Sequence, residues 1–290
     1  LAQSKAVRDK LEEFKKSGKF VYAYANYYTQ SEYYLNSVAD QVYLNPMGEV
    51  DFKGLSSEII YMKDLQEKSG VKLEVIRHGK YKSAVEPFLA QEMSPENREQ
   101  MTVLLNSVWN TIVADISKSR KLSVIQLNAI ANTLGARTPE LALANKLVDK
   151  VAYEDEYHDM IRAKLKVDKK EKYDIVSITD YAKKAASTVE DYSKNDIIAV
   201  IYAQGEIAGG EGDVNVIGEG SIKRSLEEAR KDKDVKAIVI RVNSPGGSAL
   251  TSELIWREIE ITKKTKPVVV SMGNYAASGG YYIAANADRI

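Results

Sequence analysis

The sequence predicts an α/β protein in which parallel sheets are flanked by helices. Two β-branched runs, at 237–242 and directly after Pro267, each pass through a glycine-containing turn into a helical stretch. A helix at about 251–262 joins the runs, so the two strands are expected to lie side by side, with both turns at the carboxyl edge of the sheet. The 290 residues, 44% hydrophobic and 28% charged, are typical of two packed domains.

Hydrophobic periodicity and turn residues predict the other elements in chain order. The expected helices span 4–16, 31–39, 59–68, 95–118, 142–148 and 281–287, and the expected strands span 20–25, 41–44, 73–76 and 197–202. Residues 205–220 are interpreted as a loop, in which Glu206 and Glu211 would repel a pyrophosphate and the glycines lack dinucleotide-binding spacing. We divide the chain into a first domain at 1–165, a polar connector at 166–195 and a second domain at 196–290.

Ser278 lies between the strand after Pro267 and the next helix, and it is followed by Gly279 and Gly280. A serine at a strand-to-helix turn has its hydroxyl near free backbone N–H groups, where an acyl-transfer nucleophile works best. The alternative is that Ser278 only caps the helix, a position that favours serine in any case.

The neighbouring turn, Asn243-Ser-Pro-Gly246-Gly247, is expected at the same sheet edge. Gly246 or Gly247 can then donate one N–H to an oxyanion, and Gly279 a second. The alternative is that both turns are ordinary connections that need glycine for their geometry.

Lys82 follows an apolar run and Gly79, beside aromatic and small residues. A lysine acts as a general base only when neutral, so burial or nearby positive charge must lower its pKa from about 10.4 to about 7–8. Without that, Lys82 is one solvated lysine among many. His78 is the rival base, since its ordinary pKa is already near neutrality, whereas His158 lies in an acidic stretch and is expected to be exposed.

Three strings together resemble the signal peptide peptidase A family, in its long, tandem-repeat bacterial type. They are Asn243-Ser-Pro-Gly-Gly, Ala277-Ser-Gly-Gly-Tyr and Tyr81-Lys-Ser-Ala-Val-Glu-Pro-Phe. The resemblance implies a Clp/crotonase-like fold of tandem modules and a serine–lysine peptidase. It implies Ser278 as the nucleophile, Lys82 as the general base, an oxyanion hole from Gly279 with Gly246 or Gly247, and no role for His78.

The resemblance further implies the surroundings of the enzyme. Substrates would be cleaved signal peptides and other short, apolar, unfolded peptides, and no cofactor or metal would be needed. By the same resemblance the protein would be a homo-oligomer, a tetramer, anchored in the bacterial inner membrane with its catalytic part on the periplasmic or extracytoplasmic side. Residues 205–220 would then form a mobile loop bordering the peptide groove.

An internal repeat supports a tandem architecture. A shift of 248 positions lays 19–42 over 267–290, and the identities there are Val21/Val269, Asn26/Asn274, Tyr27/Tyr275, Tyr33/Tyr281, Tyr34/Tyr282, Ala39/Ala287 and Asp40/Asp288. Gln30 then stands where the second copy has Ser278, so the first copy is predicted to be degenerate and to contribute Lys82 instead. The same register predicts that the chain is a piece of a longer protein.

Composition excludes several classes of function. Lys+Arg and Asp+Glu both number 41, so there is no bulk attraction to nucleic acid. The absence of cysteine excludes disulfides and thiolate metal sites, and two distant histidines argue against a catalytic zinc centre. Two rivals to the peptidase stay open: a crotonase-like thioester enzyme, and a non-catalytic membrane-side scaffold that uses the tyrosine-rich segment 22–34 as an interface.

Overall fold

The computed structural model describes residues 1–186 and 196–290 of the chain. These residues form two compact units, comprising essentially 1–173 and 174–290. Each unit is built around its own parallel sheet with flanking helices, which confirms the predicted α/β class.

The first unit is centred on a three-stranded parallel sheet in the order β1-β2-β3. Its strands are β1 (Tyr22–Ala25), β2 (Gln41–Leu44) and β3 (Lys150–Val151), and its helices are α1 (Ala2–Lys16), α2 (Gln30–Asn36), α5 (Pro95–Arg120), α6 (Val124–Asn132), α7 (Pro139–Ala144) and α8 (Glu154–Leu165). Tyr28, Tyr33 and Leu127 are fully buried in its core. The two tyrosine hydroxyls donate to backbone carbonyls, so each phenol is satisfied inside that core.

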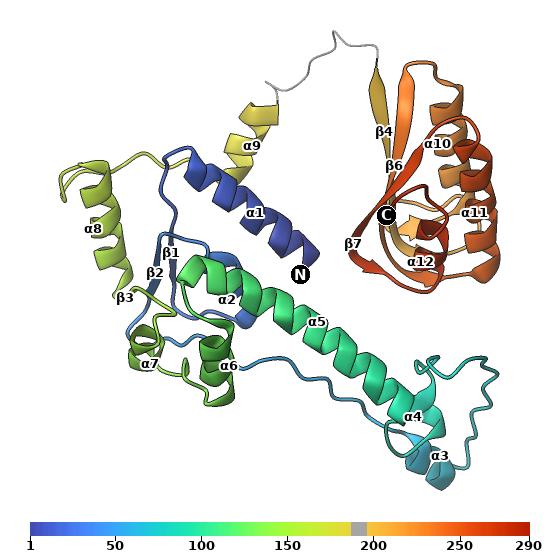
Figure 1. The fold of residues 1–290 in the computed structure, drawn as a ribbon, viewed down its shortest axis with the longest axis horizontal. Helices are drawn as coiled ribbons and strands as arrows, with labels where there is room; N and C mark the ends of the chain where they lie inside the picture. Colours follow the sequence, from blue (N-terminus) through green and yellow to red (C-terminus); the bar gives the residue numbers. More distant parts are fainter. Residues whose placement is uncertain (187–195) are drawn as a thin grey trace. The chain divides into compact units, whose positions relative to one another are not determined.

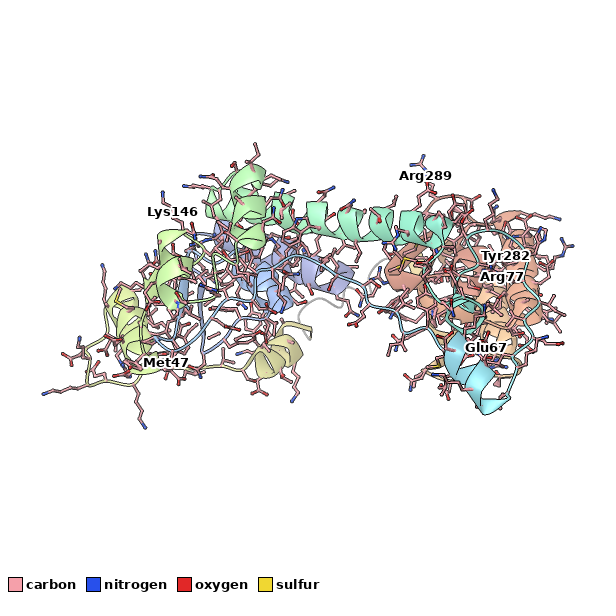
Figure 2. All side chains as sticks on the ribbon, turned by 90° about the horizontal axis from the view of Figure 1, so that it is seen from below. Met47, Glu67, Arg77, Lys146, Tyr282 and Arg289 are labelled. Atoms are coloured by element: carbon pink, nitrogen blue, oxygen red, sulfur yellow. The ribbon has the colours of Figure 1, made fainter. Side chains whose placement is uncertain are left out.

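A small lobe carries Lys82 at the far end of this unit. It consists of α3 (Lys63–Ser69), α4 (Glu86–Leu89) and the intervening extended chain. Helix α5 runs from the sheet to the lobe (Figure 1), with Ile112, Val113 and Ile116 buried in the core of the unit. Glu67 and Arg77 mark the lobe in Figure 2. A single continuous helix of 26 residues therefore links the lobe to the body of the first unit.

The second unit contains a four-stranded parallel sheet in the order β5-β4-β6-β7. Its strands are β4 (Ile197–Ile207), β5 (Val216–Ile217), β6 (Val235–Gly247) and β7 (Val268–Ala276), and its helices are α9 (Ile178–Ala186), α10 (Glu219–Lys231), α11 (Ala249–Lys263) and α12 (Gly279–Ala284). Helices α10 and α11 cover the same face of the sheet (Figure 1). Buried Ile238, Ile240 and Leu226 belong to the core between these layers.

Several predicted elements differ from the structure. Residues 73–76 are not a strand: Ile76 is fully exposed, and this run pairs with no strand in the described part of the chain. The helix expected at 142–148 lies at Pro139–Ala144 instead, because the left-handed backbone at Lys146 turns the chain toward β3. The loop expected at 205–220 is shorter, because β4 continues to Ile207, β5 follows, and α10 begins at Glu219.

Other elements were missed altogether. Helices α6, α8 and α10 were not predicted, and the connector expected at 166–195 contains α9. His158 is half-buried rather than exposed, and its Nδ1 is hydrogen-bonded to the hydroxyl of Tyr173. The rest of that connector, at 187–195, lies outside the described residues.

The internal repeat is visible in the hydrogen bonds of both units. The Asp40 carboxylate accepts from the Val21 N–H (2.9 Å), and the Asp288 carboxylate accepts from the Val268 N–H (2.8 Å). In each copy the same aspartate returns its own N–H to the same strand residue. Asp40 and Asp288 are 248 positions apart, but the two strand residues are 247 apart. The strands of the two copies are therefore shifted by one residue relative to the sequence register.

Candidate active site

Ser278 has an unusual backbone conformation at the junction between β7 and α12. Its φ is 50° and its ψ is −121°, a region that residues with a side chain rarely adopt. It stands at the N-cap position of α12, but its side chain makes no capping hydrogen bond. Ser278 is also exposed. The helix-cap alternative therefore fails, and a strained turn presents the hydroxyl to the outside of this unit.

Glycines allow the turn at Ser278 to pack closely against the end of β6. A Cβ on Gly246, whose φ is 98°, would lie 2.7 Å from both the Ser278 Cβ and the Gly279 N. A Cβ on Gly279 would lie 2.5 Å from the Ser252 Oγ, and one on Gly280 would lie 2.7 Å from the Ser244 carbonyl oxygen. Such separations are not sterically possible without movement. Glycine at 246 and 280 therefore lets the two strand ends meet, and glycine at 279 lets the turn lie against Ser252 of α11.

The backbone N–H groups around Ser278 are not all available. Gly280 donates to the Ala277 carbonyl (2.8 Å) and Gly246 donates to the Ser244 Oγ (3.1 Å). No hydrogen bond within the described part of the chain engages the N–H of Gly279, although this residue is buried. A buried N–H without a partner is rare. It lies on the residue after Ser278, where an oxyanion formed at the serine would be stabilised.

Asn243 holds the end of β7 in place, a role that sequence reasoning missed. The ladder between β6 and β7 changes register between Val242 and Ser244. At this break the Asn243 Oδ1 accepts from the N–H groups of Asn274 (3.0 Å) and Tyr275 (3.1 Å). A single side-chain oxygen therefore replaces the missing ladder bonds three residues before Ser278. The position beside a turn was the only signal for it in the sequence.

Tyr282 lies one turn into α12, four residues after Ser278. Its hydroxyl donates to the Glu253 carboxylate, and this bond, together with partial burial and the carboxylate charge, raises the pKa of Tyr282. The phenol therefore stays protonated at neutral pH. It cannot serve as the base for Ser278 in this arrangement.

Lys82 lies in the lobe of the first unit, between Gly79 and α4. Its side chain is exposed, as is that of His78, and its carbonyl accepts from Arg77 (2.9 Å). The loop that carries it is fixed to the start of α5: Gln100 bonds the Ser83 hydroxyl and Tyr81 bonds Glu99. Because the two units are separate bodies, the structure describes Lys82 and Ser278 each in its own surroundings.

Glu86 anchors this loop from inside the lobe. It is only 3% exposed, and its carboxylate accepts from the Ser94 N–H (2.7 Å) and the Asn97 side-chain amide (2.6 Å). Burial alone would raise the pKa of the Glu86 carboxyl, but the hydrogen bonds outweigh it and lower that pKa below its ordinary value. Glu86 is therefore ionised at neutral pH, and it ties the segment after Lys82 to the N-terminus of α5.

The corresponding turn of the first copy is occupied by its own side chain. Gln30 donates to the Gly54 carbonyl (2.9 Å) and accepts from the N–H groups of Lys53 (3.2 Å) and Gly54 (3.1 Å). Thr29 and Glu32 form a complete capping box at the start of α2. The Gln30 side chain therefore binds the backbone at 53–54, whereas Ser278, at the equivalent turn of the second copy, makes no comparable bond.

Two structural features are absent from the described residues. No group of three or more His, Cys, Asp or Glu side chains there could hold a metal ion. Within the same residues, no helix has the length and apolar character required to cross a membrane.

The chain is similar to one family of proteins over most of its length. The model of peptidase family S49 matches residues 13–168 and 260–290, which include Lys82 and Ser278. Protease 4 of Haemophilus influenzae is 39% identical over 97% of this chain and 47% of its own length, and Protease 4 of Salmonella typhi is 39% identical over 97% and 46%. The chloroplastic serine protease SPPA of Arabidopsis thaliana is 33% identical over 98% and 42%. The chain spans about half the length of these relatives.

Proposed function

Because the chain belongs to peptidase family S49, we propose that it carries the reactive groups of a serine peptidase with Ser278 as nucleophile and Lys82 as general base. The observation that carries the proposal is the strained, uncapped Ser278 followed by the unengaged N–H of Gly279. A strained turn at the end of a strand is a known way to expose a nucleophilic hydroxyl. The relatives named as proteases, among them a serine protease, support the reaction class.

The reaction would proceed in two stages. Neutral Lys82 takes the proton of the Ser278 hydroxyl, and the oxygen attacks the carbonyl carbon of a peptide bond. The oxyanion accepts from the Gly279 N–H and from the Gly246–Gly247 turn, each donor contributing about 3 kcal/mol. If Gly246 is that donor, it must give up its bond to the Ser244 hydroxyl. The charged Lys82 then protonates the leaving amine, and water hydrolyses the acyl-enzyme.

Lys82 needs a less polar environment than its own unit provides. Its side chain is exposed in the lobe, and a neutral amine at neutral pH requires burial or neighbouring positive charge. We propose that the turn bearing Ser278, from the same chain or a neighbouring copy, supplies the burial when the dyad assembles.

The wider assignments rest on the family resemblance of the three sequence motifs. They are cleaved signal peptides and other short apolar peptides as substrates, a homo-tetramer, and an anchor in the bacterial inner membrane with the catalytic part on the extracytoplasmic side. The domain division at 1–165, 166–195 and 196–290 belongs to the same set of proposals.

The test is labelling of the full-length protein with a fluorophosphonate serine probe, followed by intact mass and peptide mapping. We expect one adduct at Ser278 in the wild type and none in Ser278→Ala or Lys82→Ala. His78→Ala is the matched control, since it removes the rival base four residues from Lys82, and it should label like the wild type. An adduct elsewhere, or normal labelling without Lys82, would refute the dyad and favour the thioester-enzyme or scaffold alternatives.

A further inference from the structure

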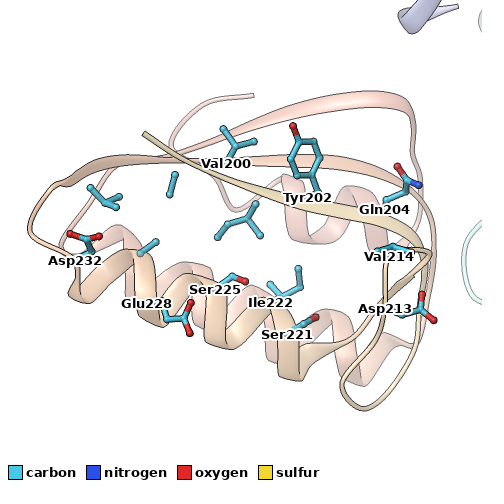
Figure 3. A pocket seen from close by; sticks show the side chains of 14 residues that line it. Val200, Tyr202, Gln204, Asp213, Val214, Ser221, Ile222, Ser225, Glu228 and Asp232 are labelled. Carbon is cyan, nitrogen blue, oxygen red and sulfur yellow. The ribbon is translucent and has the colours of Figure 1, made fainter. Parts of the chain in front are cut away.

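The second unit has a groove on the outer side of α10, between that helix and strand β4 (Figure 3). The groove encloses about 770 Å³. Its floor is apolar, with Ala199, Ile201 and Ile222, while Ser225 and Glu228 of α10 line one side. Strand β6 pairs with one edge of β4, but the opposite edge has no strand neighbour between Ile197 and Gly205 in the described residues, because β5 pairs only with Glu206 and Ile207.

An open strand edge beside an apolar groove is a feature that proteins usually cover. Strand β4 is also apolar on its outer face, where Val200 is 50% and Tyr202 is 74% exposed. Both side chains point away from α10 in Figure 3. The edge and the groove therefore lack the strand and the helix that would complete this side of the sheet.

A largely exposed segment of the required kind precedes β4 in the chain. We call residues 174–186 the pre-β4 segment; it consists of a stretch without regular secondary structure at 174–176, then Ser177, then helix α9. Ile175, Val176 and Ile178 are 80%, 64% and 81% exposed. In α9, Ile178, Tyr181, Ala182 and Ala185 recur at helical spacing and form one apolar stripe. Ile175 and Val176 are β-branched, which suits them to a strand.

The pre-β4 segment repeats the local design of the β6–α11 junction. Ser248 follows β6 directly and caps α11 through the Thr251 N–H (3.2 Å). Ser177 directly follows the stretch at 174–176 and accepts from the Asp180 N–H (3.0 Å) at the start of α9. Twenty residues, 248–267, separate β6 from β7, and twenty residues, 177–196, separate Val176 from β4. The segment therefore has the form of one more strand–helix unit.

Handedness decides where such a unit would pack. The crossovers from β4 to β6 and from β6 to β7 place α10 and α11 on one face of the sheet. A strand added at the open edge of β4 continues this order, so the right-handed rule places its helix on the same face, next to α10. That position is the groove. A helix parallel to α10 there would bring Lys183 and Lys184 to the end bearing Glu228 and Asp232, which are exposed.

We propose that the pre-β4 segment of this chain docks on its own second unit, with Asp174–Val176 as a short parallel strand on β4 and the apolar stripe of α9 in the groove. The sheet then has five strands and its edge is a short strand that begins with a charged residue. The free part of the connector shrinks to the lysine-rich stretch at 166–172. This inference concerns packing and does not depend on the peptidase reaction.

Because the chain has no cysteine, engineered cysteine pairs test the docking with no native thiol that could react with the cross-linker. We would treat the double variant Ala182→Cys/Ser225→Cys with a short bis-maleimide and analyse it by denaturing electrophoresis and peptide mapping. The matched control is Ala182→Cys/Val239→Cys, since Val239 pairs with Val200 of β4, whose side chain points away from α10. We expect an intrachain link at least about tenfold faster in the first pair, as docking raises the effective concentration.

The other outcomes each decide against the proposal. A link between two chains means that a second copy supplies the segment, and equal rates for both pairs mean that α9 has no fixed position. Hydrogen exchange of 198–203 gives an independent readout. Ile175→Asp/Ile178→Asp should abolish protection of this edge, whereas Ile60→Asp, at a residue of the first unit that is 74% exposed, should leave it unchanged. Protection that persists in the double variant overturns the proposal.

Discussion

The bond between Asn243 and the end of β7 gives the sharpest test of how the turn at Ser278 is held. The Asn243→Ala variant removes the acceptor of two backbone N–H groups, those of Asn274 and Tyr275. A typical hydrogen bond contributes about 0.5–1.5 kcal/mol net, so two contribute about 1–3 kcal/mol. Both residues are exposed, and water can replace part of the loss. We therefore expect a destabilisation of about 1–2 kcal/mol.

The assay is denaturant unfolding of the second unit, paired with the rate of fluorophosphonate labelling at Ser278. The freed strand end should let the strained turn relax, and we expect labelling to slow by about tenfold, equivalent to 1.4 kcal/mol. Asn243→Asp keeps an acceptor oxygen at the same position and should recover most of both losses. Asn243→Ala with wild-type unfolding and a wild-type labelling rate would refute the reasoning.

Three further predictions concern the two turns and the lobe. Gly246→Ala places a Cβ 2.7 Å from the Ser278 Cβ, at a residue with a φ of 98°. Denaturant unfolding should show a decrease of about 1–3 kcal/mol in the free energy of unfolding, and an unchanged midpoint would contradict this. The pKa of the Glu86 carboxyl is lowered in the folded state. The ionised carboxylate therefore stabilises the folded lobe fully above the pKa of the unfolded chain, about 4.3, and this stabilisation is lost as the pH falls through the folded pKa. Hydrogen exchange of the lobe should accelerate below about pH 4, and Glu86→Gln should flatten this dependence. Gln30→Ser should gain no probe adduct, since it removes the bonds to Gly54 without creating the glycine turn, and a second adduct would disprove this.

Local sequence patterns predicted the second unit well because its strands are long and β-branched. The helix expected at about 251–262 corresponds to α11, and the strand expected at 197–202 forms the first part of β4. Glycine at 246, 279 and 280 was expected to permit a tight turn, and the structure gives the reason in the close approach of two strand ends. These features depend on neighbours in sequence or on sterically small residues, which a sequence displays directly.

Features that depend on distant contacts were not predictable in the same way. The apolar run at 73–76 has the composition of a strand, but no other strand is available to pair with it in the described residues. The role of Asn243 requires knowledge of where the β6–β7 ladder breaks. Helix α6 is different, since the capping box between Ser123 and Gln126 was a readable signal that was overlooked.

The backbone conformation of Ser278 lowers the stability of the folded protein. A residue with a Cβ at φ 50° and ψ −121° is about 1–3 kcal/mol less stable there than in an ordinary conformation, and glycine would avoid most of that strain. The most stable residue at position 278 is therefore one that abolishes the hydroxyl. Under the proposed assignment of Ser278 as the nucleophile, the serine exchanges part of the folding free energy for reactivity. For trapping peptide complexes, the inactive variant Ser278→Gly should therefore be more stable than Ser278→Ala, because glycine tolerates this backbone conformation.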